Sequence, residues 1–235
     1  MTDLSQSCID TCMGARMDTF IAPPCVDEIK ILYQDESLLL IDKPSGLLTL
    51  SGKNPLNLDS VHYRLVKEFP TALMIHRLDF GTSGLLVVAL NKEAAARLNR
   101  QFQVRSVVKT YQAVLAGQMD ADIGDIELPI AKDPINFPKL KICLASGKTA
   151  HSHYHVLERQ PGPDTTRVLF TPHTGRTHQL RIHSAGVGHP ILGCDLYGTP
   201  ETQQMAPRLL LHATTLEFDH PITGERFYGV SDCPF

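Results

Sequence analysis

The feature that most constrains the fold of this chain is a long series of short strand-like segments with hardly a helix between them. From Val107 onward, turn residues separate segments that are rich in β-branched and aromatic residues. The segments are VVKTYQAVLAG, ELPIA, KICLA, KTAHSHYHVLE, TRVLFTP, RLLLHATTLEF and ERFYGV. Strands that follow one another without a regular alternation with helices favour antiparallel pairing. The sequence therefore predicts an α+β fold with a mixed, mainly antiparallel central sheet and peripheral helices.

The first half of the chain supplies further strands and two of the expected helices. Asp59 or Ser60 can cap a helix over residues 61–69, and Asn91 can cap another over residues 92–105. A third helix fits THQLRIHSAGV, with Thr177 as its cap. Further strands are expected over residues 29–33, 38–43, 73–78 and 85–90. In total we expect about nine strands and three or four helices.

The chain is expected to form one domain behind an N-terminal extension. Residues 1–28 show no periodicity, whereas residues 29–235 show no change of composition that would divide them. The extension carries Cys8, Cys12 and Cys25, which lack an obvious fourth ligand at a fixed spacing. Free thiols are therefore favoured over a metal site there. The chain has 6 cysteines, too few for a disulfide scaffold at this length.

The composition excludes several classes of protein. The chain has 235 residues, 43% of them hydrophobic, but its apolar runs are too short to cross a bilayer. The N-terminus does not resemble a secretory signal, so a cytoplasmic location is expected. The net charge of −3 argues against a non-specific nucleic-acid binder. It does not argue against an enzyme with a local basic cleft.

The histidines offer one candidate metal site. His151, His153 and His155 alternate within a strand-like run, so their side chains share one face. Three imidazoles on one face can bind zinc. Polar residues on the solvent face of an ordinary strand have the same pattern, and the sequence leaves both interpretations open.

Two other segments concentrate groups that carry chemistry. In MIHRLDFGTSGLL, the charged pair Arg77 and Asp79 flanks Leu78, and small residues follow from Gly81 to Gly84. On an extended strand, Leu78 can point into the core while its two neighbours share the opposite face. The segment TPHTGRTHQLRIHSAGVGHPILGCDLYG places two arginines near a predicted helix start, where an anion can bind. An ordinary loop–helix–loop with surface arginines fits that segment equally well.

Taken together, these motifs resemble those of the RluA-type pseudouridine synthases. The resemblance rests on HRLD followed by TSGL and on GRTHQLRIH followed by GHPILGCDLYG. KPSGLL, KTYQAVLAG and RLLLHATTLEFDHPITGE fit the same family, so the likeness runs from about residue 29 to residue 230. ILYQDE and MAPRLLLHA resemble the RluA branch, which acts on 23S rRNA and on the tRNA anticodon stem-loop. The resemblance implies the catalytic fold of pseudouridine synthases with an RNA-binding cleft. The S4 domain of some relatives is not expected, because residues 1–28 are too few to form it.

The resemblance also implies three catalytic residues. Asp79 matches the catalytic aspartate, and Arg176 matches the arginine that is paired with this carboxylate. Tyr111 matches the active-site tyrosine that stacks on the uracil. Whether the Tyr111 hydroxyl also removes the C5 proton stays open.

Four further residues are expected to bind the substrate. Arg77 matches the arginine that enters the RNA stack where the target base leaves, and Leu180 matches an apolar position in the uracil pocket. His76 and Arg181 lie in the same two motifs. The target base cannot be reached inside a stacked helix, so it must be flipped out. The small residues Gly81 to Gly84 are expected to let the nucleotide approach the backbone closely.

The resemblance implies an isomerase that acts on tRNA, rRNA or both. No cofactor, no nucleotide and no metal is expected for this chemistry, and a monomer without membrane contacts is expected. Three alternatives remain from the sequence. They are the same chemistry on one different uridine, an RNA-binding protein that has lost catalysis, and a metal-dependent hydrolase built on the histidines.

Overall fold

The structure is a computed structural model, which describes residues 20–235. Within this range it contains 12 strands, four α-helices and one 3-10 helix. The first strands are β1 (Lys30–Gln34), β2 (Leu38–Lys43), β3 (Leu73–Met74), β4 (Ser83–Ala89), β5 (Val108–Ala116) and β6 (Ile123–Ile126). They are followed by β7 (Ile130–Lys132), β8 (Leu140–Ile142), β9 (Ser152–Gln160), β10 (Thr165–Pro172), β11 (Leu211–Asp219) and β12 (Arg226–Val230). The helices are η1 (Pro55–Asn57), α1 (Val61–Leu65), α2 (Lys92–Val104), α3 (Gln179–Gly186) and α4 (Pro200–Gln204).

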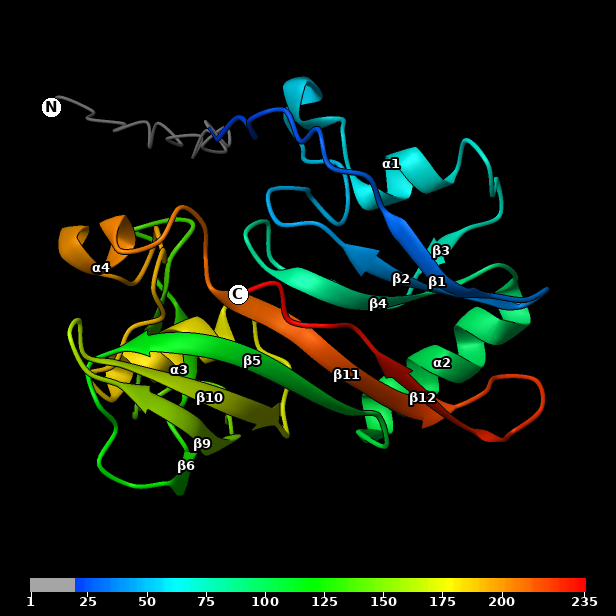
Figure 1. The fold of residues 1–235 in the computed structure, drawn as a ribbon. Helices are drawn as coiled ribbons and strands as arrows, with labels where there is room; N and C mark the ends of the chain where they lie inside the picture. The colour runs from blue at the N-terminus through cyan, green and yellow to red at the C-terminus, as the bar shows by residue number, and fades with distance from the viewer. Residues whose placement is uncertain (1–19) are drawn as a thin grey trace, which may run out of the picture.

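Ten strands form one sheet that is mixed and mainly antiparallel, as the sequence predicts. Its order is β1-β2-β4-β11-β5-β10-β9-β6, with β3 paired to β4 and β12 paired to β11. Figure 1 shows β1, β2 and β4 on one side of β11, and β5, β10 and β9 on the other. Among the described strands, only the β4–β11 pair is parallel, and it joins just two residue pairs. The sheet therefore consists of two half-sheets that meet at β11.

Both faces of β2 and β4, the inner strands of the first half-sheet, are buried, whereas β1 is exposed. In β4 every residue is buried, and successive side chains enter two different clusters. Leu85 and Val87 pack toward α2, whereas Leu86 and Val88 pack toward α1. Because successive side chains of a strand point to opposite faces, an uninterrupted apolar run serves two cores. The second half-sheet packs against α3 around Phe170 and Leu180.

Gly84 makes the junction of the two half-sheets possible. Its φ is +109°, and a Cβ at this position would lie 2.3 Å from the carbonyl oxygen of Ala213 in β11. A Cβ at Gly81 would lie 3.1 Å from the Cβ of Leu209, which is a tight contact with the segment before β11. The expectation that these glycines make room for the nucleotide is therefore wrong. The space is filled by β11 and the segment before it.

The helices follow the sequence pattern with local corrections. Asn91 caps α2, since its Oδ1 accepts a hydrogen bond from Ala94 N at 2.9 Å. Ser60 caps α1, but this helix ends at Leu65, short of the predicted residue 69. α3 begins after His178, not directly after Thr177, and the chain enters it with His178 at φ 56°. No helix within residues 20–235 is both long and apolar enough to cross a membrane.

The described part of the predicted extension lies against the domain. The Asn57 side chain is hydrogen-bonded to the backbone of Phe20 and Ala22, and Arg64 donates to the carbonyl oxygens of Cys25 and Asp27. Cys8 and Cys12 lie outside the described residues. Residues 20–28 are thus held on the side of the domain that carries α1.

Candidate active site

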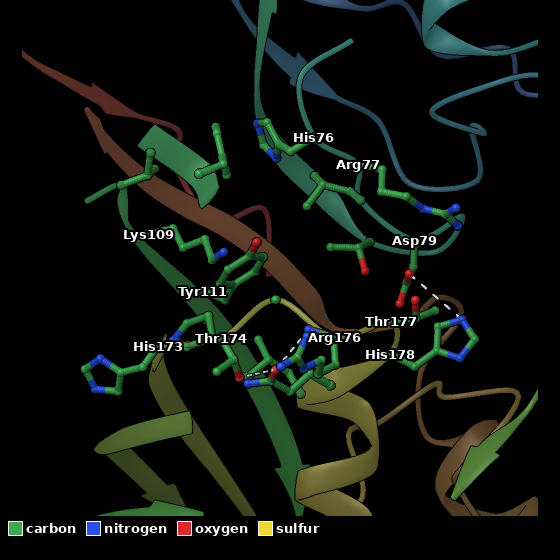
Figure 2. A pocket seen from close by; sticks show the side chains of 18 of the residues that line it. His76, Arg77, Asp79, Lys109, Tyr111, His173, Thr174, Arg176, Thr177 and His178 are labelled. Atoms are coloured by element: carbon green, nitrogen blue, oxygen red, sulfur yellow. Dashed lines mark hydrogen bonds and ion pairs between the residues drawn. The ribbon is translucent and has the colours of Figure 1, made fainter. Parts of the chain in front are cut away.

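The sequence-predicted residues gather around one open cleft of about 720 Å³. Its walls come from the loop before β4, the end of α2, the start of β5, and the segment from the end of β10 into α3 (Figure 2). Asp79 is the only carboxylate in the described lining. The cationic side chains around it are Arg77, Arg105, Lys109, Arg176 and Arg181. A chain with a net charge of −3 therefore still presents a basic cleft.

Asp79 lies in a loop and not on a strand, because β3 ends at Met74. Two hydrogen bonds in the protein interior hold the loop in place. Leu78 is buried, and both its backbone N–H and its carbonyl are bonded to the Thr49 hydroxyl. As predicted, Leu78 enters the core, whereas Arg77 and Asp79 line the cleft. The loop is closed by a hydrogen bond from Thr82 N to Asp79 O at 3.1 Å. The aspartate is thus held by a rigid turn.

Lys43, the first residue of KPSGLL, supports this turn from the protein interior. It is fully buried, and its Nζ donates to the carbonyl oxygens of Pro44 and Leu47 at 2.8 Å and of Phe80 at 3.3 Å. Burial lowers the pKa of Lys43 to about 7. The KPSGLL motif therefore stabilises the loop that carries Asp79.

The arginine that approaches Asp79 is Arg181, and the expected pairing with Arg176 is wrong. Arg181 Nη1 lies 3.7 Å from Asp79 Oδ2, and its other terminal nitrogen is bonded to Asp195. Arg176 instead donates from Nε to the carbonyl of Thr149 at 2.9 Å. The reason is the position of the helix start. Arg176 precedes α3, whereas Arg181 lies in its first turns, where side chains point back toward the helix N-terminus.

His178 is a site residue that the sequence analysis missed. Its Nε2 lies 3.9 Å from Asp79 Oδ1 (Figure 2), so His178 and Arg181 approach the two oxygens of the carboxylate separately. Its Nδ1 is 2.8 Å from the hydroxyl of Tyr197, and burial lowers the pKa of His178. A left-handed backbone is uncommon for a residue other than glycine and often marks a functional site. The only sequence signal was its place between two arginines in GRTHQLR.

Tyr111 projects into the cleft from β5, as Figure 2 shows. Burial, and next the charge of Asp79, raise the pKa of Tyr111 well above its ordinary value. Its hydroxyl is therefore protonated throughout the neutral range. Leu180 lines the same cleft and is also buried in the core of the second half-sheet.

The remaining predicted residues differ in how they reach the cleft. Arg77 is exposed, and it forms no hydrogen bond or ion pair with the rest of residues 20–235. His76 lines the cleft, but its Nε2 accepts a hydrogen bond from Val87 N at 3.1 Å and its ring stacks on Phe102. Burial, with a smaller contribution from Lys109, lowers the pKa of His76 to about 3. His76 is therefore neutral and cannot attract phosphate by charge.

Comparison with known proteins relates most of the chain to one family of RNA-modifying enzymes. The sequence model of the family described as RNA pseudouridylate synthase matches residues 37–186. A dual-specificity RNA pseudouridine synthase RluA from Yersinia pestis is 48% identical over 205 residues, which cover 87% of this chain and 99% of the relative. Its counterpart from Escherichia coli K12 is 45% identical over 202 residues, or 86% of this chain and 92% of the relative.

A solved structure extends the likeness to the fold. Human RNA pseudouridylate synthase domain containing 1 superposes with a TM-score of 0.75 at 32% identity, over 91% of this chain and 86% of that protein. The sequence motifs, the observed sheet and the cleft around Asp79 thus agree, and the chain belongs to the RNA pseudouridylate synthase family.

Proposed function

We propose that this pseudouridine synthase uses Asp79 as its catalytic carboxylate and modifies uridines in the tRNA anticodon stem-loop and in 23S rRNA. One observation carries the catalytic assignment: among residues 20–235, Asp79 is the only carboxylate that lines the basic cleft, and Arg181 and His178 lie at its two oxygens. The basic side chains of the lining suit the phosphates of RNA, which dominate the affinity of nucleic-acid complexes.

The reaction is an isomerisation of uridine. The C1′–N1 bond breaks, the uracil turns, and C5 bonds to C1′, while the proton from C5 is lost and N1 gains one. Asp79 acts at the sugar, either as a nucleophile or as the group that assists departure of the base. Arg181 supplies its counter-charge. This pairing suits a carboxylate that must stay ionised while water is excluded.

His178 faces Asp79 at the end of a directed hydrogen-bond chain. The backbone N–H of Leu140 donates to the Tyr197 hydroxyl at 2.9 Å, so this hydroxyl has its own proton free for His178 Nδ1. With Nδ1 as acceptor, the neutral ring carries its proton on Nε2, which faces Asp79. Arg181 and His178 therefore both present donors, and His178 acts as a positioning residue.

Tyr111 is assigned to stacking and not to proton removal. A tyrosine can accept the C5 proton only as phenolate, and the raised pKa of Tyr111 makes that form scarce at neutral pH. Its ring lines the cleft near Asp79, where a flipped uracil would lie. Arg77, exposed at the same cleft, is placed to enter the gap left in the RNA stack.

The test is tritium release from RNA that carries tritium at C5 of uridine. Bulk tRNA and 23S rRNA serve as separate substrates, with the wild type beside Asp79→Asn. Release from both RNAs by the wild type alone is the expected result. Release from one RNA selects a single-target enzyme, and equal release by Asp79→Asn refutes the role of the carboxylate. A monomer, a cytoplasmic location and independence from nucleotide cofactors are further parts of the proposal, and size-exclusion chromatography with light scattering tests the first.

A further inference from the structure

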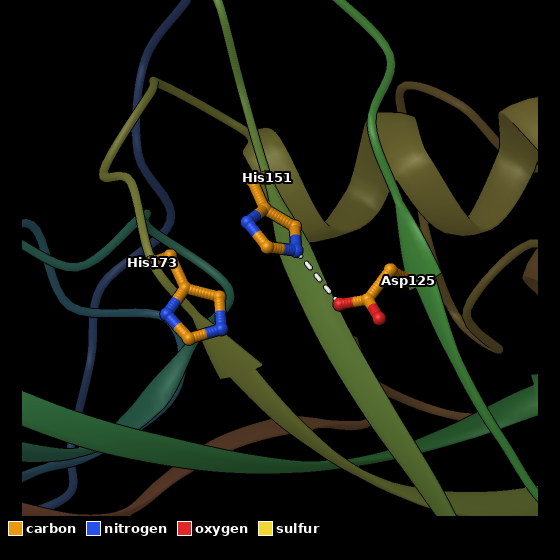
Figure 3. A group of neighbouring side chains, drawn as sticks. All are labelled: Asp125, His151 and His173. Atoms are coloured by element: carbon orange, nitrogen blue, oxygen red, sulfur yellow. Dashed lines mark hydrogen bonds and ion pairs between the residues drawn. The ribbon is translucent and has the colours of Figure 1, made fainter.

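Three neighbouring strands bring a second group of titratable side chains to the rim of the cleft. Asp125 lies in β6, His151 directly before β9, and His173 directly after β10 (Figure 3). His173 also lines the cleft. No hydrogen bond or ion pair joins any of these three, the histidine–aspartate cluster, to Asp79 within residues 20–235. The cluster is thus separate from the groups assigned to the reaction.

The strand register fixes the positions of the cluster. Ser152 is paired with Pro172 of β10 on one side and with Ile126 of β6 on the other. Ser152 is buried, so His151 points to the opposite, outer face. His173 N donates to His151 O at 3.0 Å, which continues the ladder by one more pair. Backbone hydrogen bonds between strands therefore hold these side chains together, as a preorganised binding site requires.

The potential ligand atoms converge on His151. Its Nε2 lies 2.7 Å from Asp125 Oδ1 and 3.8 Å from Glu127 Oε1. Asp125, His151 and His173 each offer an atom within 4.8 Å of the other two, and the two imidazole rings are 4.4 Å apart. Zinc bonds of about 2.0–2.2 Å need a ligand spacing of this order, reached by small side-chain rotations.

The charge of the cluster favours a cation. Asp125 and Glu127 form ion pairs only with histidines, and no lysine or arginine of residues 20–235 is bonded to either. Two carboxylates beside imidazole rings form a site that is rich in oxygen and nitrogen ligands.

We propose that His151, His173 and Asp125 bind a divalent transition-metal ion, with zinc as the best match to two imidazoles and one carboxylate. Glu127 or water completes the coordination. The ion takes no part in the isomerisation. It adds a positive charge at the rim of the cleft where His173 lies, and this consequence alone rests on the proposed function. The alternating histidines therefore contribute one ligand, and the other two come from neighbouring strands.

The test is titration of chelator-treated protein with Co²⁺, followed by its visible absorption, and with Zn²⁺, followed by calorimetry. Wild type is compared with His173→Ala and Asp125→Asn. The matched control is His155→Ala, an exposed histidine further along the same face of β9. Wild type and control are expected to bind one equivalent, whereas each cluster variant loses at least about tenfold in affinity.

Two results would overturn the proposal. One is the absence of binding to the wild type, and the other is equal affinity in all four proteins. A thiolate-to-cobalt absorption band that survives His173→Ala would assign the metal to cysteines instead. Circular dichroism of the metal-free proteins confirms that each variant is folded. Because the readout is metal binding, the result is independent of tritium release from RNA.

Discussion

Arg181→Met is the most informative change, because Arg181 is the only arginine of residues 20–235 that forms an ion pair with the catalytic carboxylate. The variant keeps the length and the apolar packing of the side chain but removes its charge. Arg181 is 5% exposed at the side chain and Asp79 is 16% exposed, so solvent screens their interaction only in part. Two unit charges about 4 Å apart interact by about 4 kcal/mol at an effective dielectric constant of about 20.

The rate should reflect this loss. Removing one partner of a buried pair costs about 3–5 kcal/mol, because the other charge is left uncompensated. Part of that cost will lower the folding stability, so we expect single-turnover tritium release to fall by about 100- to 1,000-fold. The affinity for RNA should change by less than about threefold, because a buried guanidinium that already holds Asp79 and Asp195 has little access to phosphate.

Arg176→Met is the matched control from the same segment. It should leave the single-turnover rate within about threefold and weaken RNA binding, with a smaller dependence of affinity on salt. Filter binding at two ionic strengths and single-turnover kinetics measure the two effects separately. Equal losses of rate in both variants, or a larger loss in Arg176→Met, would refute the assignment of Arg181. Thermal unfolding of both variants shows how much of the change is due to stability.

Three further predictions follow from the site. Tyr111→Phe should keep the rate of tritium release within about tenfold of the wild type. Tyr111→Ala should lower this rate more than about 100-fold, because the stacking surface is lost. A severe loss of rate in Tyr111→Phe would show that the hydroxyl removes the proton. His178→Phe should lower kcat by about tenfold or more at nearly constant KM. His178→Gln can still donate a hydrogen bond, so it should keep part of the lost kcat. Equal kcat values in the two variants would exclude a donor role for His178. The folded pKa of Lys43, about 7, lies below its unfolded value of 10.5, so the unfolded chain binds the extra proton between these values. The free energy of unfolding of the wild type, relative to that of Lys43→Met, should therefore increase as the pH rises from about 7 to 10.5. Denaturant titrations at several pH values measure this difference, and a constant difference would refute the prediction.

The sequence predicts most elements whose cause is local. Asn91 precedes an amphipathic run and caps α2 where expected, because capping depends on residues three positions apart. The apolar residues before Asp79 predict a strand over residues 73–78. The segment leaves the sheet because Thr49, distant in sequence, binds both backbone groups of Leu78. Contacts of this kind leave no local signal.

The candidate site divides in the same way. The motif locates Asp79, Tyr111 and the two arginines, but the choice between Arg176 and Arg181 depends on the residue at which α3 begins. That residue is set by the left-handed turn at His178, which only the folded chain requires. Likewise, alternation predicts the shared face of His151 and His153, whereas the approach of Asp125 and His173 depends on strand register. Register is a property of paired strands and cannot be read from one of them.

The central place of β11 has a consequence for how the enzyme is made. β11 lies between β4 and β5, although both precede it by a long stretch of chain. During synthesis the ribosome releases each half-sheet before the strand that joins them, so neither has its inner neighbour until β11 has emerged. Contacts between residues so far apart in sequence also slow folding. The Asp79 loop and Arg181, which lie on opposite sides of this strand, therefore come together only late in the synthesis and folding of the protein.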